Sequence, residues 1–317
     1  MTDYTKLIDA ETWAFIKRTN SYYPPDTIDY TIAQQREIYD RMCREFFAGY
    51  PKGVMAETTA IVAPRAASGR DVPIRVYRLA GETPEAVVLY FHGGGFILGG
   101  LDSHDDVCAE LCGRTGYEVV SVDYRLAPEH RHPAAFDDAM AAFEWAMAMY
   151  SQPIVLAGDS AGGNIAAAVS HATRGHVRHP VGQLLIYPGL GGDRSRGSYV
   201  SHAEAPMLTM RDLEFYKDIR SGGEDRTGDI TLSPLADADF ANLPPTVVIT
   251  AECDPLSSDG EAYGERIVAA GGKAFWHEEP GLVHGYLRAR HTVTRARQSF
   301  TRIVDAATAL GRGEWVW

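Results

Sequence analysis

PIVLAGDSAGGNIAAAVSHAT, residues 153–173, places a serine between an apolar run and an alanine-rich run. The apolar run Ile154–Ala157 predicts a buried strand. The run Asn164–Thr173 predicts a helix, because alanine has the highest helix propensity. The G-x-S-x-G pattern between them is typical of a sharp strand-to-helix turn that exposes the hydroxyl of Ser160 at the end of a sheet. Its two glycines flank the serine because a Cβ on either side would clash in so tight a turn.

The chemistry of Ser160 depends on partners elsewhere in the chain. A glycine-rich turn with an idle serine is the alternative interpretation of the same pattern. If Ser160 is a nucleophile, Ala161 presents its backbone N–H in the first turn of the next helix, where N–H groups lack partners and anionic oxygen is favoured. The rest of the chain must then supply further oxyanion donors, an acid and a base.

The bulk composition indicates a globular protein with a sizeable core. The chain has 317 residues, of which 45% are hydrophobic and 10% aromatic, enough for one large α/β domain or two small ones. A formal net charge of −12 argues against nucleic acid or an anionic membrane surface as the main partner. No apolar run approaches the roughly 20 residues of a membrane span. The first residues also lack the basic segment and apolar core of a signal peptide, so we expect a cytoplasmic protein.

Cysteine usage favours buried thiols over a metal site. The four cysteines form no C-x-x-C pair; they are Cys43, Cys108, Cys112 and Cys253. Cys108 and Cys112 lie four residues apart on an expected helix, and no zinc pattern is present. We therefore expect no metal.

From Met55 onward, expected strands alternate with expected helices. The expected strands are 57–63, 72–79, 87–91, 118–122, 153–157, 183–187, 246–251 and 273–277. The expected helices are 101–114, 133–150, 164–173, 208–219, 257–270 and 292–310, the last one stopped by Gly311. The first two strands form an antiparallel pair through a turn at residues 67–71. The alternation predicts an α/β fold, with a mostly parallel sheet covered on both faces and ligands at the carboxyl ends of its strands.

Two segments fall outside this alternation. Residues 1–50, which precede a core domain at 51–317, show no β signal and include an expected helix at 33–47; they form either a packed N-terminal arm or part of a lid. Nearly sixty residues after Tyr187 also lack a convincing strand, and so long a connection is usually functional. We expect an insertion over the active site at about 190–225. Its side chains either line an acyl pocket or pack the insertion together. The residues expected at the substrate are Phe96, Met207, Leu208, Phe215 and Tyr216.

A glycine run follows the strand at 87–91. His92–Phe96 reads HGGGF, and consecutive glycines let the backbone approach a ligand and turn N–H groups towards it. At this place in the fold, Gly94 and Gly95 are expected to join Ala161 as oxyanion donors. The alternatives are a flexible loop or a phosphate-binding turn, but the pattern is neither G-x-G-x-x-G nor a Walker loop, and no lysine follows it. His92 is expected to be structural.

The acid and the base are expected downstream of Ser160, in the order acid then histidine. Asp254 follows the strand at 246–251, and His284 follows the last strand. Both therefore lie past strand carboxyl ends, at the same edge of the sheet as Ser160. His284 would take the serine proton, and Asp254 would fix its tautomer. The less well placed competitors are His277, His291, Glu252, Asp259 and Glu279.

HGGGF, YRLAPEHRHPAAFDDA, GDSAGG, DPL and HG, in this order and spacing, resemble the bacterial esterases related to hormone-sensitive lipase, family IV. The resemblance covers residues 55–317. It implies an α/β-hydrolase fold with a helical cap built from the N-terminus and the insertion after Tyr187. It also implies hydrolysis of carboxylic esters, usually with short acyl chains, without a cofactor. A homodimer is plausible by this resemblance.

The resemblance assigns roles to residues already singled out. It supports Ser160, Asp254 and His284 as a triad, and it supports the three N–H donors as an oxyanion hole. The segment Ser257–Gly260 reads SSDG, where relatives commonly carry RDEG; this departure affects a supporting position. The same triad could serve an amidase, lactonase, thioesterase or carbamate hydrolase. A non-catalytic binding protein on this fold would be expected to lose a triad member.

Overall fold

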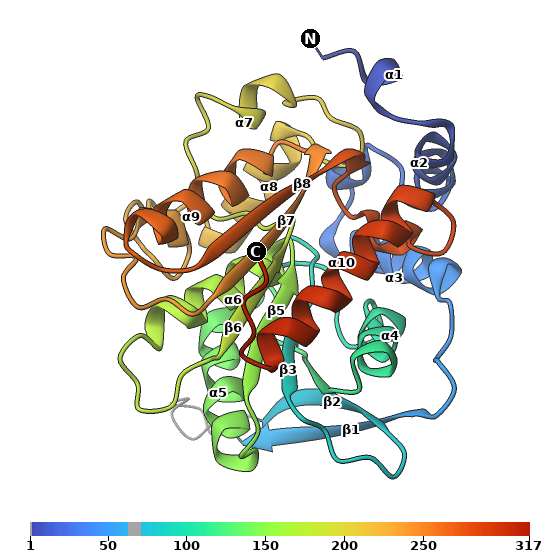
Figure 1. The fold of residues 1–317 in the computed structure, drawn as a ribbon. Helices are drawn as coiled ribbons and strands as arrows, with labels where there is room; N and C mark the ends of the chain where they lie inside the picture. Colours follow the sequence, from blue (N-terminus) through green and yellow to red (C-terminus); the bar gives the residue numbers. More distant parts are fainter. Residues whose placement is uncertain (1, 63–70) are drawn as a thin grey trace.

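A single sheet runs through the molecule, whose computed structural model describes residues 2–62 and 71–317 (Figure 1). Its strands are β1 (Val54–Val62), β2 (Asp71–Leu79), β3 (Val87–Phe91), β4 (Glu118–Val122), β5 (Ile154–Asp159), β6 (Gly182–Ile186), β7 (Thr246–Cys253) and β8 (Ala274–Val283). They lie in the order β1-β2-β4-β3-β5-β6-β7-β8. β2 pairs antiparallel with β1 and β4, and all other neighbours pair parallel.

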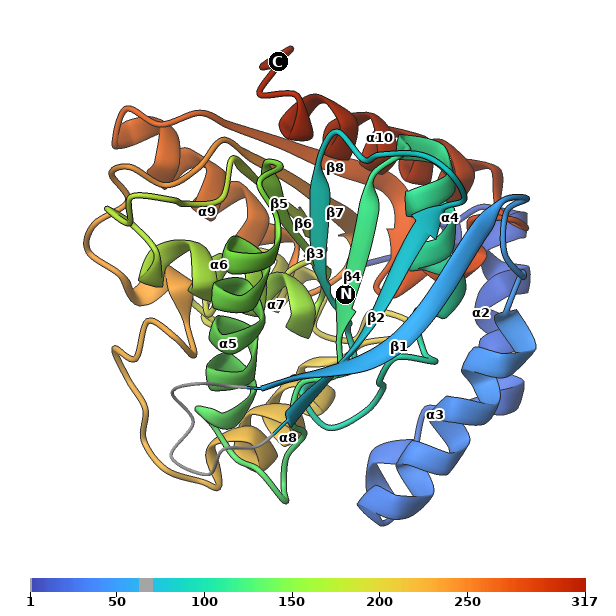
Figure 2. The ribbon, with the colours of Figure 1, turned by 90° about the horizontal axis from the view of Figure 1, so that it is seen from below.

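Helices cover both faces of this sheet. They are α1 (Tyr4–Leu7), α2 (Ala10–Tyr22), α3 (Ile32–Phe46), α4 (Asp105–Thr115), α5 (Ala134–Met149), α6 (Ala161–Ala172), α7 (Ser198–Ser201), α8 (Met210–Ser221), α9 (Ser257–Ala269) and α10 (Thr294–Gly311). Figure 2 shows α5 and α6 on one side of the sheet and α4 and α10 on the other. Val88 and Tyr90 of β3 pack in the cluster with α4 and α10, whereas Val87 and Leu89 pack in the cluster with α5 and α6. Because successive side chains of a strand point to opposite faces of the sheet, β3 contributes to the hydrophobic cores on both faces.

The predicted fold class, a mostly parallel sheet between helices, is confirmed. β3 and β4 begin and end where the sequence predicts, because each is a short run buried on both faces. The expected antiparallel pair is β1 and β2. The expected turn between them, at residues 67–71, lies outside the described residues except for Asp71.

β8 is longer than the predicted strand at 273–277. It continues through Glu278, Glu279 and Pro280 to Val283, and the two carboxylates and the proline hid this extension in the sequence. The proline is tolerated because β8 is the edge strand of the sheet, where a missing N–H costs little. A register shift after Ala251 brings Cys253 opposite Val283. The extension therefore places His284, which follows β8, next to Asp254, which follows β7.

Most helix boundaries also differ from the sequence prediction, by one to four residues. α4 begins at Asp105 rather than at residue 101. α10 does not stop before Gly311, which is its last residue. A Cβ at Gly311 would lie 2.4 Å from the ring of Tyr117, and the positive φ beyond the helix belongs to Gly313. Close packing, not a C-cap conformation, therefore requires glycine at position 311.

α3 and α8 meet above the loop that follows β3. Tyr39 and Met42 of α3 form a cluster with Ile97 and Leu98 of that loop, and Tyr216 of α8 packs against it. The connection from β6 to β7 carries α7 and α8 and contains no strand in residues 187–245, all of which the structure describes. Across residues 2–62 and 71–317, none of the helices has the length and apolar character needed to cross a membrane.

Candidate active site

Ser160 occupies a strained turn between β5 and α6. Its φ is 54° and its ψ is −115°, a conformation that non-glycine residues adopt only where the surroundings enforce it. The close approach of backbone explains the flanking glycines. A Cβ at Gly162 would lie 1.9 Å from the carbonyl oxygen of Phe91, and one at Gly158 would lie 2.5 Å from Gly162. The turn also exposes the first-turn N–H groups of α6 beside the serine hydroxyl.

A chain of hydrogen bonds connects Ser160 to a buried carboxylate. His284 Nε2 lies 2.9 Å from Ser160 Oγ, and His284 Nδ1 lies 2.7 Å from Asp254 Oδ2. Asp254 is 0% exposed, and its Oδ1 accepts the N–H of Leu256 at 2.9 Å. Because an ionised carboxylate only accepts hydrogen bonds, Nδ1 carries the proton and Nε2 accepts the serine hydroxyl. This is the protonation pattern that a general base requires.

Neighbouring strands bring Ser160, His284 and Asp254 together. His284 follows Val283 at the end of β8, and Asp254 follows Cys253 at the end of β7. The pairing of Val283 with Cys253 therefore places the imidazole beside the carboxylate. The ring of Tyr187, which follows β6, packs edge-on against the imidazole with centroids 4.8 Å apart.

The competing residues have other partners. His277 lies 3.7 Å from Glu279, and His291 lies 2.8 Å from Glu110. Glu252 accepts the N–H of Gly281 at 2.7 Å. None of these contacts involves Ser160, so the geometry favours His284 and Asp254.

Three residues with unpaired backbone N–H groups line the same pocket as Ser160. Gly94, Gly95 and Ala161 line this pocket together with Ser160 and His284. In the described part of the chain, the N–H groups of these three residues donate to no protein acceptor. Gly94 and Gly95 have φ values of 128° and 60°, which favour glycine. Unpaired donors beside a nucleophile suit an oxygen that gains negative charge.

Asp159 holds the glycine loop in place, a role that sequence reasoning missed because its only signal was its position in GDSAGG. Its Oδ1 accepts the N–H of Gly93 at 2.9 Å and the hydroxyl of Tyr90 at 2.8 Å. Its Oδ2 lies 3.2 Å from His104 Nε2. Burial alone would raise the pKa of Asp159, but the charge and hydrogen bonds of His104, with that of Tyr90, hold this pKa well below its usual range. The loop that carries the unpaired N–H groups is thus tied to the strand that ends at Ser160.

His92 is a structural residue of this loop, as expected. Its Nδ1 lies 2.8 Å from the carbonyl oxygen of Gly93, so this nitrogen donates. Its ring stacks on Tyr124 with centroids 4.3 Å apart. Burial lowers the pKa of His92 to about 4, so the ring is neutral at physiological pH.

The pocket above Ser160 has a volume of about 460 Å³. Of the expected substrate contacts, Phe96, Met207, Leu208 and Tyr216 line it. Phe215 is not among the lining residues that the structure describes; it packs in the cluster around Tyr39. Adjacent positions of a helix point about 100° apart, so Tyr216 lines the cavity while Phe215 does not, although both pack against the cluster around Tyr39.

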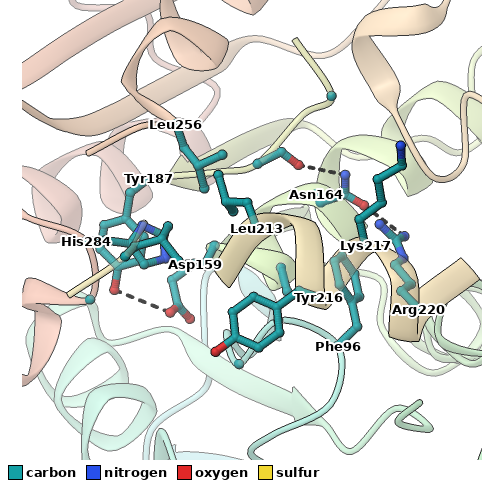
Figure 3. A pocket seen from close by; sticks show the side chains of 18 of the residues that line it. Phe96, Asp159, Asn164, Tyr187, Leu213, Tyr216, Lys217, Arg220, Leu256 and His284 are labelled. Atoms are coloured by element: carbon teal, nitrogen blue, oxygen red, sulfur yellow. Dashed lines mark hydrogen bonds between the residues drawn. The ribbon is translucent and has the colours of Figure 1, made fainter. Parts of the chain in front are cut away.

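Sequence reasoning missed much of the pocket wall, which Figure 3 shows at close range. α8 contributes residues at 213, 216, 217 and 220, a helical face that spacing alone could have identified. Thr19 of α2, Tyr23 directly after that helix, and Tyr39 and Met42 of α3 form a second wall. His284 and Tyr187 lie on one side of the view, and Asn164, Lys217 and Arg220 lie on the other.

Comparisons with known proteins agree with this geometry. Residues 88–288 match a family model described as alpha/beta hydrolase fold. The chain is 41% identical over 258 residues to Carboxylesterase NlhH of Mycobacterium tuberculosis, covering 77% of this chain and 76% of that protein. It is 34% identical over 250 residues to Ethyl acetate hydrolase of Pseudomonas putida, covering 75% and 78%. A hyperthermophilic esterase from Pyrobaculum calidifontis superposes with a TM-score of 0.86 at 30% identity, covering 96% of this chain and 99% of that one.

Proposed function

The chain belongs to the α/β-hydrolase-fold family, in its branch of hormone-sensitive-lipase-like bacterial esterases, and we propose that it hydrolyses carboxylic esters through Ser160, His284 and Asp254. The observation that carries this proposal is the chain of hydrogen bonds from Asp254 through His284 to Ser160, beside three unpaired N–H groups. Nucleophile, base, orienting carboxylate and oxyanion donors are the parts that acyl transfer needs.

In the first half of the reaction, the Oγ of Ser160 attacks the ester carbonyl carbon. His284 Nε2 accepts the hydroxyl proton, and the carboxylate of Asp254 stabilises the resulting imidazolium. The carbonyl oxygen becomes an oxyanion that the N–H groups of Gly94, Gly95 and Ala161 bind; one such donor typically lowers the barrier by about 3 kcal/mol. His284 then protonates the leaving alcohol, and an acyl-serine remains.

In the second half, water replaces the alcohol. His284, neutral again, accepts a proton from water, whose oxygen attacks the acyl carbon. The second oxyanion occupies the same N–H groups. His284 then returns the proton to Ser160 Oγ, and the carboxylic acid leaves. One ester and one water thus give one acid and one alcohol.

Residues 1–50 and the insertion at about 190–225 serve as a cap that closes the pocket over short acyl chains. This part of the proposal is supported by the joint packing of α3 and α8 and by their shared contribution to the pocket wall. A pocket of about 460 Å³ suits a small ester better than a long-chain lipid. A relative is named ethyl acetate hydrolase, which is consistent with a small substrate.

Replacing the nucleophile tests the proposal. Ser160→Ala should abolish turnover of p-nitrophenyl acetate and butyrate, because no other hydroxyl contacts His284 Nε2 in the described chain. Ser170→Ala is the matched control: Ser170 is buried on the same helix, and its hydroxyl has no partner among the described residues. The control should retain activity. Phenylmethylsulfonyl fluoride should label Ser160, as peptide mass spectrometry would show; turnover retained by Ser160→Ala would place the nucleophile elsewhere.

A further inference from the structure

A second polar group lines the pocket on the side opposite His284 (Figure 3). Lys217 and Arg220 lie three residues apart on α8, so they share one face of that helix. Asn164 of α6 lies beside them, and its Oδ1 accepts a hydrogen bond from Arg220 Nη2 at 3.1 Å. All three residues belong to the lining of the same cavity as Ser160.

Arg220 is a buried cation without a carboxylate partner. It is 7% exposed, and within residues 2–62 and 71–317 it forms no ion pair with an acidic side chain. Its guanidinium stacks over the ring of Phe96 at 3.5 Å. Burial lowers the pKa of Arg220 to about 9. Asp229, which acts on Arg220 from a distance, is engaged by His132 at 3.1 Å.

Arg220 keeps donors for a ligand. A guanidinium has five N–H donors. The hydrogen bonds to Asn164, Thr231 and Leu232 use three of them. In the described chain, the remaining two have no protein acceptor. These bonds also hold the guanidinium in one orientation, which lowers the entropic cost of binding an anion.

The other cations of the pocket are unpaired as well. Lys217 is exposed at the rim, and Arg194 and Arg288 line the same cavity. None of these three forms an ion pair with a carboxylate among the residues that the structure describes. Asp159 is the only acidic residue in the described lining, and its hydrogen bonds to Tyr90, His104 and Gly93 already engage it. The cavity is therefore positive in a protein of net charge −12.

From this group we propose that Lys217 and Arg220 bind a carboxylate carried by the ester substrate. The preferred substrates are then esters with a second, free carboxylate, on either the acyl or the alcohol part. This inference rests on the proposed function, because the ester must reach Ser160. Asn164 follows Ser160 by one helical turn, a rise of about 5.4 Å, so the chain between ester and carboxylate is short.

Matched pairs of esters test the subsite. Monoethyl glutarate carries the carboxylate on the acyl part and is compared with ethyl pentanoate. 4-Acetoxybutanoate carries it on the alcohol part and is compared with butyl acetate. The rate is followed by titration of the released acid. For at least one pair, kcat/KM of the charged ester should exceed that of its neutral partner by about tenfold or more, as expected for a charge-assisted hydrogen bond. Added salt should reduce this preference.

Reversing the charge of Lys217 tests whether the preference for charged esters comes from Lys217 and Arg220. Lys217→Glu should lower the ratio of charged to neutral kcat/KM by about tenfold, because an exposed side chain changes sign without disturbing the core. Lys273→Glu reverses another exposed lysine, just before β8 at the opposite end of the sheet, and should leave the ratio unchanged.

The outcomes separate the two claims. If the neutral esters are cleaved at least as well as both charged esters, the subsite is overturned and the proposed function stands. The same conclusion follows if the preference for charged esters survives Lys217→Glu. No turnover of any of the four esters would overturn both.

Discussion

In the proposed mechanism, the protonation state of one imidazole determines whether Ser160 can react. Asp254 sets that state, because its carboxylate accepts from His284 Nδ1 and leaves Nε2 free for the serine hydroxyl. An amide at position 254 could donate instead and stabilise the opposite tautomer, in which Nε2 carries the proton. The serine would then lose its base while every distance stayed nearly the same.

Asp254→Asn should therefore lower kcat for p-nitrophenyl butyrate by about 10³ to 10⁴ with little change in KM. Glu252→Gln is the matched control, since Glu252 lies two residues away and its oxygen would still accept the N–H of Gly281. Steady-state kinetics of both variants provide the measurement. A loss smaller than about tenfold in Asp254→Asn would remove Asp254 from the proposed role.

Among the elements, the turn from β5 into α6 has the tightest backbone packing described above. At Gly162 a Cβ would meet the carbonyl of Phe91, which is backbone and cannot rotate away. Gly264 in α9 is a suitable comparison, because the nearest atom to its Cβ would be 3.6 Å away.

Gly162→Ala should destabilise the protein by about 3 kcal/mol or more, in line with severe overpacking. Gly264→Ala should be neutral or stabilise by up to about 1 kcal/mol, because alanine favours the helix. Denaturation in urea measures both changes in the free energy of unfolding. Equal stability of the two variants would contradict the described geometry of the turn.

We expect the contact between α9 and residues 190–199 to depend on pH. Asp259 of α9 is buried, and its Oδ2 accepts the N–H groups of Leu190 and Gly191 and the hydroxyl of Tyr199. Burial raises the pKa of Asp259 to about 6, above the value of about 3.9 in an unfolded chain. The folded protein therefore binds this proton more tightly, and the stability that Asp259 contributes is greatest below pH 4 and is lost as the pH rises through 6.

Asp259→Asn lacks this titration. The free energy of unfolding of Asp259→Asn minus that of the unsubstituted protein should rise by about 1 to 3 kcal/mol between pH 4 and pH 7. Urea denaturation at each pH measures this difference. A difference that stays flat, or that falls over this range, would show that Asp259 is ionised throughout.

Across the whole molecule, features encoded locally could be predicted from the sequence and features that depend on long-range packing could not. β3 is a fully apolar run and β4 is a short valine-rich segment, so the bounds of both could be predicted from the sequence. The order of the motifs predicted that Ser160, Asp254 and His284 would meet, because parallel strands end at one edge of a sheet. The far half of β8 was missed, since only its pairing with β7 stabilises a segment that contains Glu279 and Pro280.

The pocket wall was harder to predict for the same reason. Tyr216 and Phe215 are adjacent and similar in the sequence, and only the seating of α8 on α3 decides which one faces the cavity. In the sequence, nothing distinguishes Arg220 from a surface arginine. Only its position beside Asn164 of α6 in the folded protein shows that it is buried. Asp159 shows its role only when β3, β5 and the glycine loop are adjacent in space.

A crystal structure of the protein inactivated by a small alkyl phosphonate ester tests the central claim most directly, because the adduct mimics the tetrahedral intermediate. Phosphorus should be bonded to Ser160 Oγ. One phosphonyl oxygen should lie within about 3 Å of the N–H groups of Gly94, Gly95 and Ala161, with His284 Nε2 beside the serine oxygen. An adduct on another residue, or a phosphonyl oxygen pointing away from these three N–H groups, would contradict the account.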